Sequence, residues 1–240
     1  MLGLIDWIVV SIFGAFCVLD FFIHPRKFPK MRAWRTRGLI AFVIYFFVAG
    51  YSPFLWDGLL GRYTLLDASV LPFWVQVVGG FLAVQLFYYA YHRTMHSVGF
   101  LFRHSHQTHH SLERVDVWGA FYFHPIDMLG FTLMGSLALI GLFGVAAEPA
   151  SVIVVAANFC TIFQHSSVKT PRWLGYIVTR PESHSVHHQR GLHTDNFGDI
   201  PLFDMIFGTF RNPETWNEEA GFYDGASEKF WDLLIGRQVS

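Results

Sequence analysis

Five apolar runs limit what this chain can fold into. The hydrocarbon core of a bilayer requires about 20 apolar residues in a helix that crosses it, and three of the runs approach that length. Two shorter runs are joined by Ala146–Ala150 and resemble a hairpin through the bilayer. Residues are 52% hydrophobic and only 15% charged, whereas a water-soluble domain carries about 25% charge. We therefore predict an all-α integral membrane protein, one membrane domain over 1–240, with four to five transmembrane helices over 4–23, 38–60, 73–91, 128–145 and 151–163.

The basic residues predict how the chain is oriented. Six lysines and arginines lie between residues 24 and 37, whereas Arg62 is the one basic residue in 61–72. The positive-inside rule places the first of these loops in the cytoplasm. The third apolar run then ends on the cytoplasmic side, and the hairpin returns there. Residues 97–125 and 166–240 are thus predicted to form a cytosolic, histidine-rich helical cap.

Three groups of histidines lie at the predicted cytoplasmic ends of these runs. His92 and His96 are four residues apart, so they share one face of a helix. Two groups have the spacing HxxHH, and adjacent histidines cannot both reach one ion from one helical face. Eight histidines exceed the needs of one six-coordinate ion, which predicts a site for two metal ions. His124 and His165 border the same layer and extend the predicted ligands to ten: His92, His96, His106, His109, His110, His124, His165, His184, His187 and His188.

Other features narrow the chemistry of this site. The remaining histidines, His24, His104 and His193, are interpreted as surface or hydrogen-bonded residues. Cys17 and Cys160 lie in apolar segments and indicate no sulfur site. The sequence has no HExxH motif. A net charge of −1 without a basic, aromatic-rich tract argues against nucleic-acid binding. Iron changes its redox state and zinc does not, so oxidation of a lipid C–H bond would require iron.

The histidine motifs resemble those of the fatty acid hydroxylase, or sterol desaturase, superfamily. HRTMH, HSHQTHH and SHSVHH follow one another as its HxxxH, HxxHH and HxxHH boxes do. The resemblance extends from Phe81 to Pro213 and is greatest to the sterol-type branch. Phe203 stands where that branch usually has Trp. Further residues agree with the family: Phe123-His124-Pro125, Gln164-His165-Ser166, Asn196-Phe197-Gly198 and 203–210.

The resemblance implies a membrane di-iron oxygenase that uses O₂ to hydroxylate or desaturate a sterol, fatty acyl chain or other lipid. The ten histidines would hold two irons, which zinc can replace during purification. Electrons would come from a separate ferredoxin, cytochrome b5 or reductase-type protein, and a bacterial inner membrane is favoured over the endoplasmic reticulum. Carboxylates that could orient the imidazoles, or equally be solvated charges, are Asp127, Glu182, Asp195 and Asp199. Aromatic residues that could line the lipid path, or simply pack, are Phe87, Tyr88, Tyr91, Phe121 and Tyr122.

Three other functions fit the sequence less well. A haem-binding electron-transfer protein would use histidine pairs within its spans, whereas the HH doublets lie outside them. A metal-binding membrane protein or transporter would place ionisable residues near the membrane midplane, and the spans are almost free of charge. A zinc-dependent lipid hydrolase would need a serine or glutamate partner that is not evident. The sequence leaves the oligomeric state open.

Overall fold

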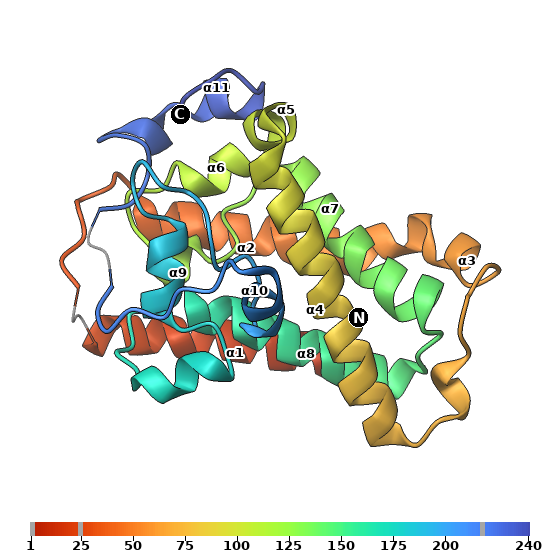
Figure 1. Cartoon of the computed structure of the whole chain (residues 1–240). Helices are drawn as coiled ribbons and strands as arrows, with labels where there is room; N and C mark the ends of the chain where they lie inside the picture. Colours follow the sequence, from red (N-terminus) through yellow and green to blue (C-terminus); the bar gives the residue numbers. More distant parts are fainter. Residues whose placement is uncertain (1–2, 24–25, 217–218) are drawn as a thin grey trace.

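The computed structural model describes residues 3–23, 26–216 and 219–240. Its main body is a bundle of five helices long and apolar enough to cross a membrane (Figure 1). Within the described residues there is no β-strand, only an isolated bridge between Gln189 and Ala220. The all-helical membrane fold predicted from the sequence is confirmed. The helices are α1 (Leu4–Phe22), α2 (Trp34–Tyr51), α4 (Phe73–Ser97), α7 (Pro125–Ser136) with its π-helical extension η5 (Leu137–Leu142), and α8 (Ala147–Gln164).

Two helix boundaries differ from the prediction in ways that affect the histidines. Helix α4 continues to Ser97, six residues beyond the predicted end, so His92 and His96 lie within its last two turns. Helix α7 begins at Pro125 with His124 as its N-cap residue. Helix α2 ends at Tyr51 and is followed by the short 3₁₀-helix η1 (Ser52–Leu55), which has Pro53 in its first turn. Apolar composition marks the membrane-spanning part but does not show where a helix continues into polar sequence.

The bundle packs around α4, which contacts both α7 and α8 (Figure 1). Gly80 makes the approach to α8 possible, because a Cβ there would lie 2.7 Å from the side chain of Ile153. A second cluster forms where α1 and α2 meet residues 117–122; the rings of Phe13 and Phe42 stack there at 4.0 Å. Large apolar side chains such as Phe22 and Trp74 stay exposed on the outside, as expected for a surface that faces lipid.

Opposite the cap, the bundle is closed by short connections. They contain α3 (Asp57–Leu60) and the 3₁₀-helix η2 (Ala68–Val70). Gln76 is buried there: its amide nitrogen donates to the carbonyl of Leu71 at 2.8 Å, and its amide oxygen accepts from the backbone of Ala146 at 2.9 Å. One side chain thus satisfies backbone groups from two connections.

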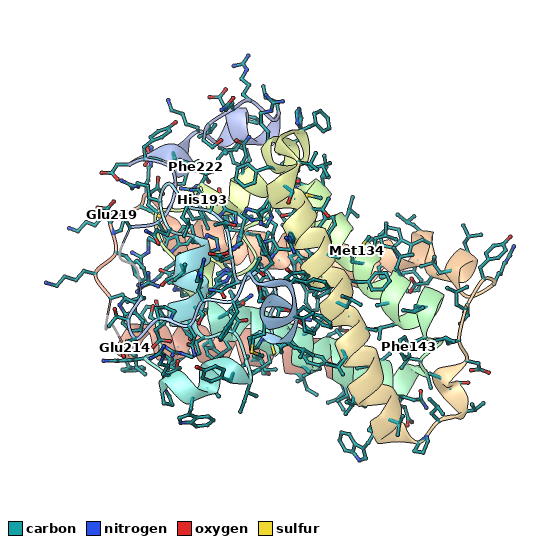
Figure 2. All side chains as sticks on the ribbon, in the orientation of Figure 1. Met134, Phe143, His193, Glu214, Glu219 and Phe222 are labelled. Carbon is teal, nitrogen blue, oxygen red and sulfur yellow. The ribbon has the colours of Figure 1, made fainter. Side chains whose placement is uncertain are left out.

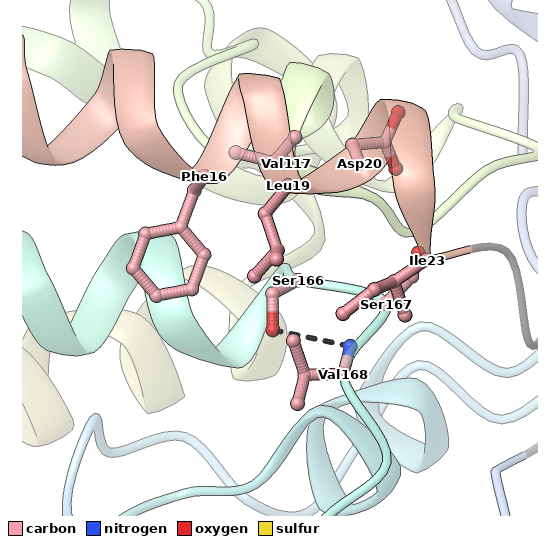
Figure 3. A pocket seen from close by; sticks show the side chains of 8 residues that line it. All are labelled: Phe16, Leu19, Asp20, Ile23, Val117, Ser166, Ser167 and Val168. Carbon is pink, nitrogen blue, oxygen red and sulfur yellow. Dashed lines mark hydrogen bonds between the residues drawn. The ribbon is translucent and has the colours of Figure 1, made fainter.

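The cap is built from short elements at one end of the bundle, where α6, α9 and α11 gather in Figure 1. Hydrogen bonds from two tryptophan side chains connect the cap to the spans. The indole of Trp34 donates to Asp116 at 2.9 Å, and that of Trp118 donates to Asp20 at 3.0 Å. A small cleft separates Asp20 from residues 166–168 (Figure 3). The cap elements are α5 (Gly99–Leu101), η3 (Phe102–His106), α6 (Gln107–His110), η4 (Val117–Gly119), η6 (Arg172–Tyr176), α9 (Pro181–His187), α10 (Leu202–Phe207), η7 (Ala226–Glu228) and α11 (Phe230–Leu234).

Gly38 should be essential to the contact between α2 and the cap. A Cβ at this position would overlap the backbone carbonyl of Trp118. Gly38→Ala should therefore lower the thermal unfolding temperature of the detergent-solubilised protein, because the helix or the Trp118 segment must shift. Gly50→Ala is the matched control on the same helix, since nothing lies within 4 Å of a Cβ there. Equal unfolding temperatures for the two variants would contradict this packing.

Candidate metal centre

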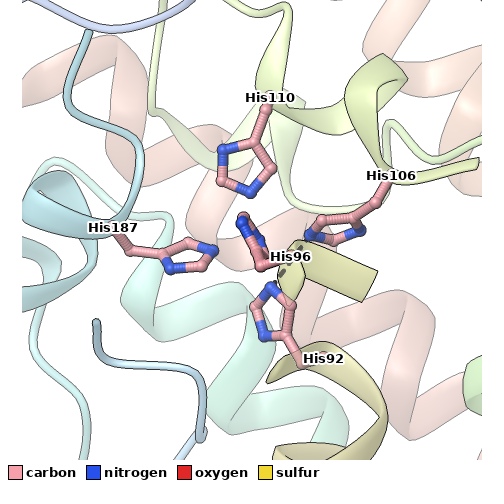
Figure 4. Close-up of side chains that lie close together, drawn as sticks. All are labelled: His92, His96, His106, His110 and His187. Atoms are coloured by element: carbon pink, nitrogen blue, oxygen red, sulfur yellow. Dashed lines mark hydrogen bonds between the residues drawn. The ribbon is translucent and has the colours of Figure 1, made fainter. Parts of the chain in front are cut away.

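Five histidines from three parts of the chain converge on one point at the cap end of α4 (Figure 4). Each offers a ring nitrogen, and these nitrogens all lie within 4.8 Å of one another. The Nε2 atoms of His92 and His106 are 2.9 Å apart. Four of the five side chains are buried and His96 is partly buried. We call this set the first histidine group; it consists of His92, His96, His106, His110 and His187.

A second histidine group lies beside the first and consists of His109, His165, His184 and His188. All four side chains are buried. The Nε2 atom of His184 lies 3.0 Å from that of His165 and 3.1 Å from that of His188. The Nε2 atoms of His109 and His165 are 3.3 Å apart. The structure thus brings nine of the ten predicted ligands into two sites.

The adjacent histidines explain why there are two groups. In the second motif, His106 and His110 belong to the first group and His109 to the second. The third motif is arranged in the opposite sense: His184 and His188 belong to the second group and His187 to the first. Neighbouring residues on a helix point about 100° apart, whereas residues four apart share a face. Each HxxHH motif therefore contributes to both sites and links them.

Local backbone structure sets the direction of these side chains. The π-helix η3 ends at His106 and leads directly into α6, which carries His109 and His110. Such π-helical turns are rare and frequently occur at functional sites. Helix α9 has only seven residues and holds His184 and His187, and His188 is its C-cap residue. His165 is the C-cap residue of α8.

The donor sets fit metal ions. Two imidazole nitrogens bound at right angles to one ion, each about 2.1 Å from it, lie about 3.0 Å apart, and the observed separations are 2.9–3.3 Å. Several buried ring nitrogens have no hydrogen-bond partner among the described residues, including Nε2 of His96, His110 and His187. Buried polar atoms are normally paired, and a cation would satisfy these lone pairs.

Burial keeps four of the imidazoles outside the spans neutral, which is the form that binds a metal. Desolvation, followed by repulsion from neighbouring histidines, holds the pKa of His184, His187 and His188 well below 6.5. The pKa of His165 falls to about 4 for the same principal reason, the burial of its ring. At neutral pH these four imidazoles therefore offer lone pairs rather than positive charges.

Hydrogen bonds from the second ring nitrogen orient several of the histidines. The Nδ1 atoms of His92, His187 and His165 lie 2.7, 2.7 and 2.8 Å from the carbonyl oxygens of Phe197, Asp195 and Thr161. A carbonyl can only accept, so each Nδ1 carries the proton and each Nε2 has a free lone pair. His106 is held by the carboxylate of Asp127, 2.6 Å from its Nδ1.

The four predicted orienting carboxylates have different environments. Asp127 makes the expected contact with a histidine. Asp195 acts on His187 through its backbone carbonyl, while its carboxylate pairs with Arg211 at 3.0 Å. Glu182 and Asp199 must be corrected, because neither has a hydrogen bond to a histidine in the described part of the chain. Glu182 binds Arg180 at 3.1 Å, and Asp199 accepts hydrogen bonds from Gln85 and Gln164 at 3.3 and 2.8 Å.

His124 also needs correction, since the structure places it in neither histidine group. Its Nδ1 accepts a hydrogen bond from the backbone of Ile126 at 3.1 Å, and its Nε2 lies 3.0 Å from the carbonyl of Leu234. Both ring nitrogens are thus occupied by the start of α7 and by α11. His-Pro at this position begins a helix, with His as N-cap and Pro in its first turn.

The three histidines excluded from the predicted site differ from one another. His104 lies outside both groups, as expected, with its Nδ1 2.8 Å from the carbonyl of Phe100. His193 is hydrogen-bonded, but to the site itself: its Nδ1 lies 3.0 Å from that of His110. Its ring also packs on Phe222 in the cap (Figure 2). His24 lies outside the described residues.

Asp204 is a buried residue of the site that the sequence reasoning did not assign. Its carboxylate accepts hydrogen bonds from the backbone of Phe197 and Gly198 at 2.8 and 2.9 Å, and from the hydroxyl of Thr209 at 2.7 Å. These bonds shape the loop whose carbonyls hold His92 and His187. The signal was present in the 203–210 motif, where Asp204 and Thr209 are five residues apart.

Two cavities adjoin the histidines and share Phe123 in their walls. The inner cavity, of about 50 Å³, touches histidines of both groups together with Tyr88, Phe121 and Asp199. The outer cavity, of about 610 Å³, lies between α2, the start of α7 and the C-terminal segment, and Tyr122 contributes to it. Among the predicted path residues, Tyr88, Phe121 and Tyr122 therefore line cavities. Phe87 packs between helices, and the hydroxyl of Tyr91 donates to Asp127 at 3.3 Å.

Comparison with known proteins agrees with this geometry. The family model described as fatty acid hydroxylase matches residues 77–209, which include all nine clustered histidines. The chain belongs to the fatty acid hydroxylase family. That family is part of the fatty acid hydroxylase/sterol desaturase superfamily.

Several curated relatives are similar over the same region. Sphinganine C4-monooxygenase 1 of Arabidopsis thaliana is 27% identical over 64% of this chain and 61% of its own length. Alkylglycerol monooxygenase of Danio rerio is 28% identical over 64% of this chain and 38% of its own length. A very-long-chain aldehyde decarbonylase of Oryza sativa subsp. indica is 28% identical over 56% of this chain and 54% of its own length. The chain thus spans less than two thirds of each relative, and no solved structure matches it.

Asp127→Asn should weaken metal binding without disturbing the fold. An amide has no negative charge with which to hold the proton on Nδ1 of His106, and loss of such partners typically costs ten- to a hundredfold in metal affinity. Titration with a competing chelator measures this affinity. The control is Asp232→Asn in α11, which removes a solvent-exposed ion pair between Asp232 and Arg237. Unchanged affinity in Asp127→Asn would show that this carboxylate does not support a metal ligand.

Proposed function

We propose that this protein is a membrane lipid monooxygenase whose two histidine groups hold two iron ions. One observation carries the proposal: nine imidazoles, eight of them buried, form two adjoining sites at the end of a membrane bundle, beside cavities whose walls include aromatic and aliphatic side chains. The names of the relatives support it, since two of them are monooxygenases of sphinganine or alkylglycerol.

Iron is favoured by the chemistry that a monooxygenase needs. Imidazole binds iron, zinc, copper and nickel, but O₂ activation requires a metal that changes its redox state. The bound irons would allow one atom of O₂ to enter a lipid C–H bond while the other leaves as water. Two electrons and two protons balance this reaction and would be supplied by a ferredoxin, cytochrome b5 or reductase-type donor protein. Zinc found after overexpression is compatible with this proposal, because zinc occupies the same ligands.

The chain's own residues keep water out and place the lipid. Phe123 covers the second histidine group: its ring centroid lies 4.3 Å from that of His109. Phe131 covers the first, with its ring centroid 5.9 Å from that of His92. Tyr88 and Phe121 complete the aromatic wall of the inner cavity. Exclusion of water protects an oxidising site from side reactions.

The orientation of the bundle follows from its charges. Six basic residues precede or begin α2 at the cap end, and Arg62 lies at the opposite end. By the positive-inside rule the cap and both histidine groups face the cytoplasm, where a reduced electron donor is available.

The packing of the rings disfavours a haem protein. The histidine rings are closely packed even between the groups: the ring centroids of His110 in the first group and His188 in the second lie only 4.3 Å apart. A porphyrin between two axial ligands would need these rings to separate. A haem uses at most two axial histidines, so most of the nine imidazoles would not serve as ligands.

Lipid analysis of cells tests the proposal directly. Cells that express the chain should contain a lipid with one added oxygen atom, or with two hydrogens fewer, and the added oxygen should derive from labelled O₂. His109→Ala should abolish this product, because it removes a ligand from the second histidine group. His104→Ala is the matched control, since His104 belongs to the same sequence motif but to neither group. An oxidised lipid that persists in His109→Ala cells would exclude this site as its source.

A further inference from the structure

We propose that the inner cavity binds a hydroxyl group of the lipid substrate through Asp199 and Gln164, and so directs oxidation to a carbon near that hydroxyl. The inference rests on the proposed lipid oxidation and specifies its substrate class. It starts from polar side chains in the cavity wall that do not hydrogen-bond to any of the clustered histidines.

Asp199 is the carboxylate that faces the inner cavity. It lies in the cap loop after Phe197, yet its side chain reaches α4 and α8, where it accepts hydrogen bonds from Gln85 at 3.3 Å and Gln164 at 2.8 Å. Its backbone carbonyl accepts from Thr179 at 2.9 Å, which holds the loop in place. Burial raises the pKa of this carboxyl to about 6. A carboxylate has about four lone-pair sites, so two bonds leave capacity for a ligand.

Gln164 lines the same cavity and has one unpaired acceptor. Its amide nitrogen is used by Asp199, while its amide oxygen is buried and has no partner among the described residues. Leaving a buried acceptor unsatisfied costs about 1–3 kcal/mol. A donor from a bound molecule would remove this cost.

Two tyrosines add hydroxyl groups to the cavity wall. Tyr45 of α2 and Tyr88 of α4 line it, and neither hydroxyl has a hydrogen bond within the described parts of the chain. A phenol can donate or accept. The wall therefore offers one carboxylate, one free amide oxygen and two hydroxyls, which suits a ligand group that both donates and accepts. An alcohol meets this requirement, whereas a carboxylate would be repelled by Asp199.

The position of this polar wall relates the hydroxyl to the reaction. The same cavity touches His92 and His106 of the first histidine group and His109, His165 and His184 of the second. Ions held between these histidines would take part of its volume of about 50 Å³, which leaves room for only a few heavy atoms of a lipid. A hydroxyl seated on Asp199 and Gln164 thus leaves its own carbon and the next few as the atoms that lie near the metal sites.

The outer cavity can accept the remainder of the lipid. Its volume is about 610 Å³, and Phe123 separates it from the inner cavity. Its walls include apolar residues of α2 and α11 such as Ile40, Ile44 and Leu233. The substrate would therefore enter with its hydroxylated end first and its chain trailing past Phe123.

Binding measurements test the hydroxyl site independently of turnover. The probes are hexadecane-1,2-diol and hexadecane, presented in the same detergent micelles to the metal-loaded protein. Native mass spectrometry of competing probes measures their relative affinity. The wild type should prefer the diol by about ten- to a hundredfold, the usual worth of a hydrogen bond to a charged group. Equal binding of the two probes by the wild type would overturn the proposal.

Variants separate recognition from a purely structural role of the same residues. Gln164→Leu and Asp199→Asn should each reduce the preference for the diol, while hexadecane still binds. Asn158→Leu is the matched control, because Asn158 is an amide on the same helix that lines neither cavity. A preference unchanged in Gln164→Leu would contradict the proposal. If Gln164→Leu loses all binding, its metal content and unfolding temperature show whether the variant is still folded. Tyr88→Phe then tests the same cavity wall with a smaller change.

Lipid products distinguish this proposal from the proposed function. If an oxidised lipid forms, fragmentation should place the new oxygen within a few carbons of an existing hydroxyl. A new oxygen far along a chain without a nearby hydroxyl would refute the hydroxyl site and leave the monooxygenase intact. If no oxidised lipid forms but the diol preference is present, the site stands and the proposed reaction fails.

Discussion

The structure depends on the meeting of nine imidazoles in two adjoining groups. Buried ring nitrogens about 3 Å apart, with lone pairs that point inward, are a poor arrangement without a cation between them. Each group draws on both spans and cap: α4, η3, α6 and α9 for the first, and α6, α8 and α9 for the second. Metal binding would therefore join parts of the chain whose own packing is limited, since the cap consists of short helices. Such binding energy contributes directly to folding.

Hydrogen bonds connect the histidines to surrounding residues that fix their positions. The loop at 195–198 supplies carbonyls to His92 and His187, and Asp204 in turn fixes that loop. Asp127 links His106 to the hydroxyl of Tyr91. Gly130 allows this contact, because a Cβ there would overlap Tyr91. The ligand positions are thus determined by backbone shape and close packing as much as by the histidines themselves.

Spans and metal motifs were predictable from sequence because both follow simple periodicities. Apolar length indicated the five helices, and adjacent histidines indicated two ions, since i and i+1 cannot share a face. The position of His165 beside other clustered histidines was also anticipated from its place at the end of a span. The contacts made by the backbone carbonyls of Phe197 and Asp195, by contrast, cannot be predicted from sequence, because every residue type has a backbone carbonyl.

The prediction for His124 was wrong because its place beside the hairpin suggested a ligand, whereas His-Pro there caps a helix. Glu182 and Asp199 were candidates for orienting imidazoles, but Glu182 pairs with Arg180 and Asp199 with two glutamines from other helices.

Metal stoichiometry is the most direct test of the central claim. Protein purified from iron-supplemented cells should contain two metal ions per chain, measured by elemental analysis against quantitative amino-acid analysis. Its X-ray absorption spectrum should show nitrogen ligands at about 2.1 Å, as expected for imidazole, and its visible spectrum should lack the Soret band of haem. A single ion per chain, sulfur ligation or a Soret band would contradict the paired histidine site.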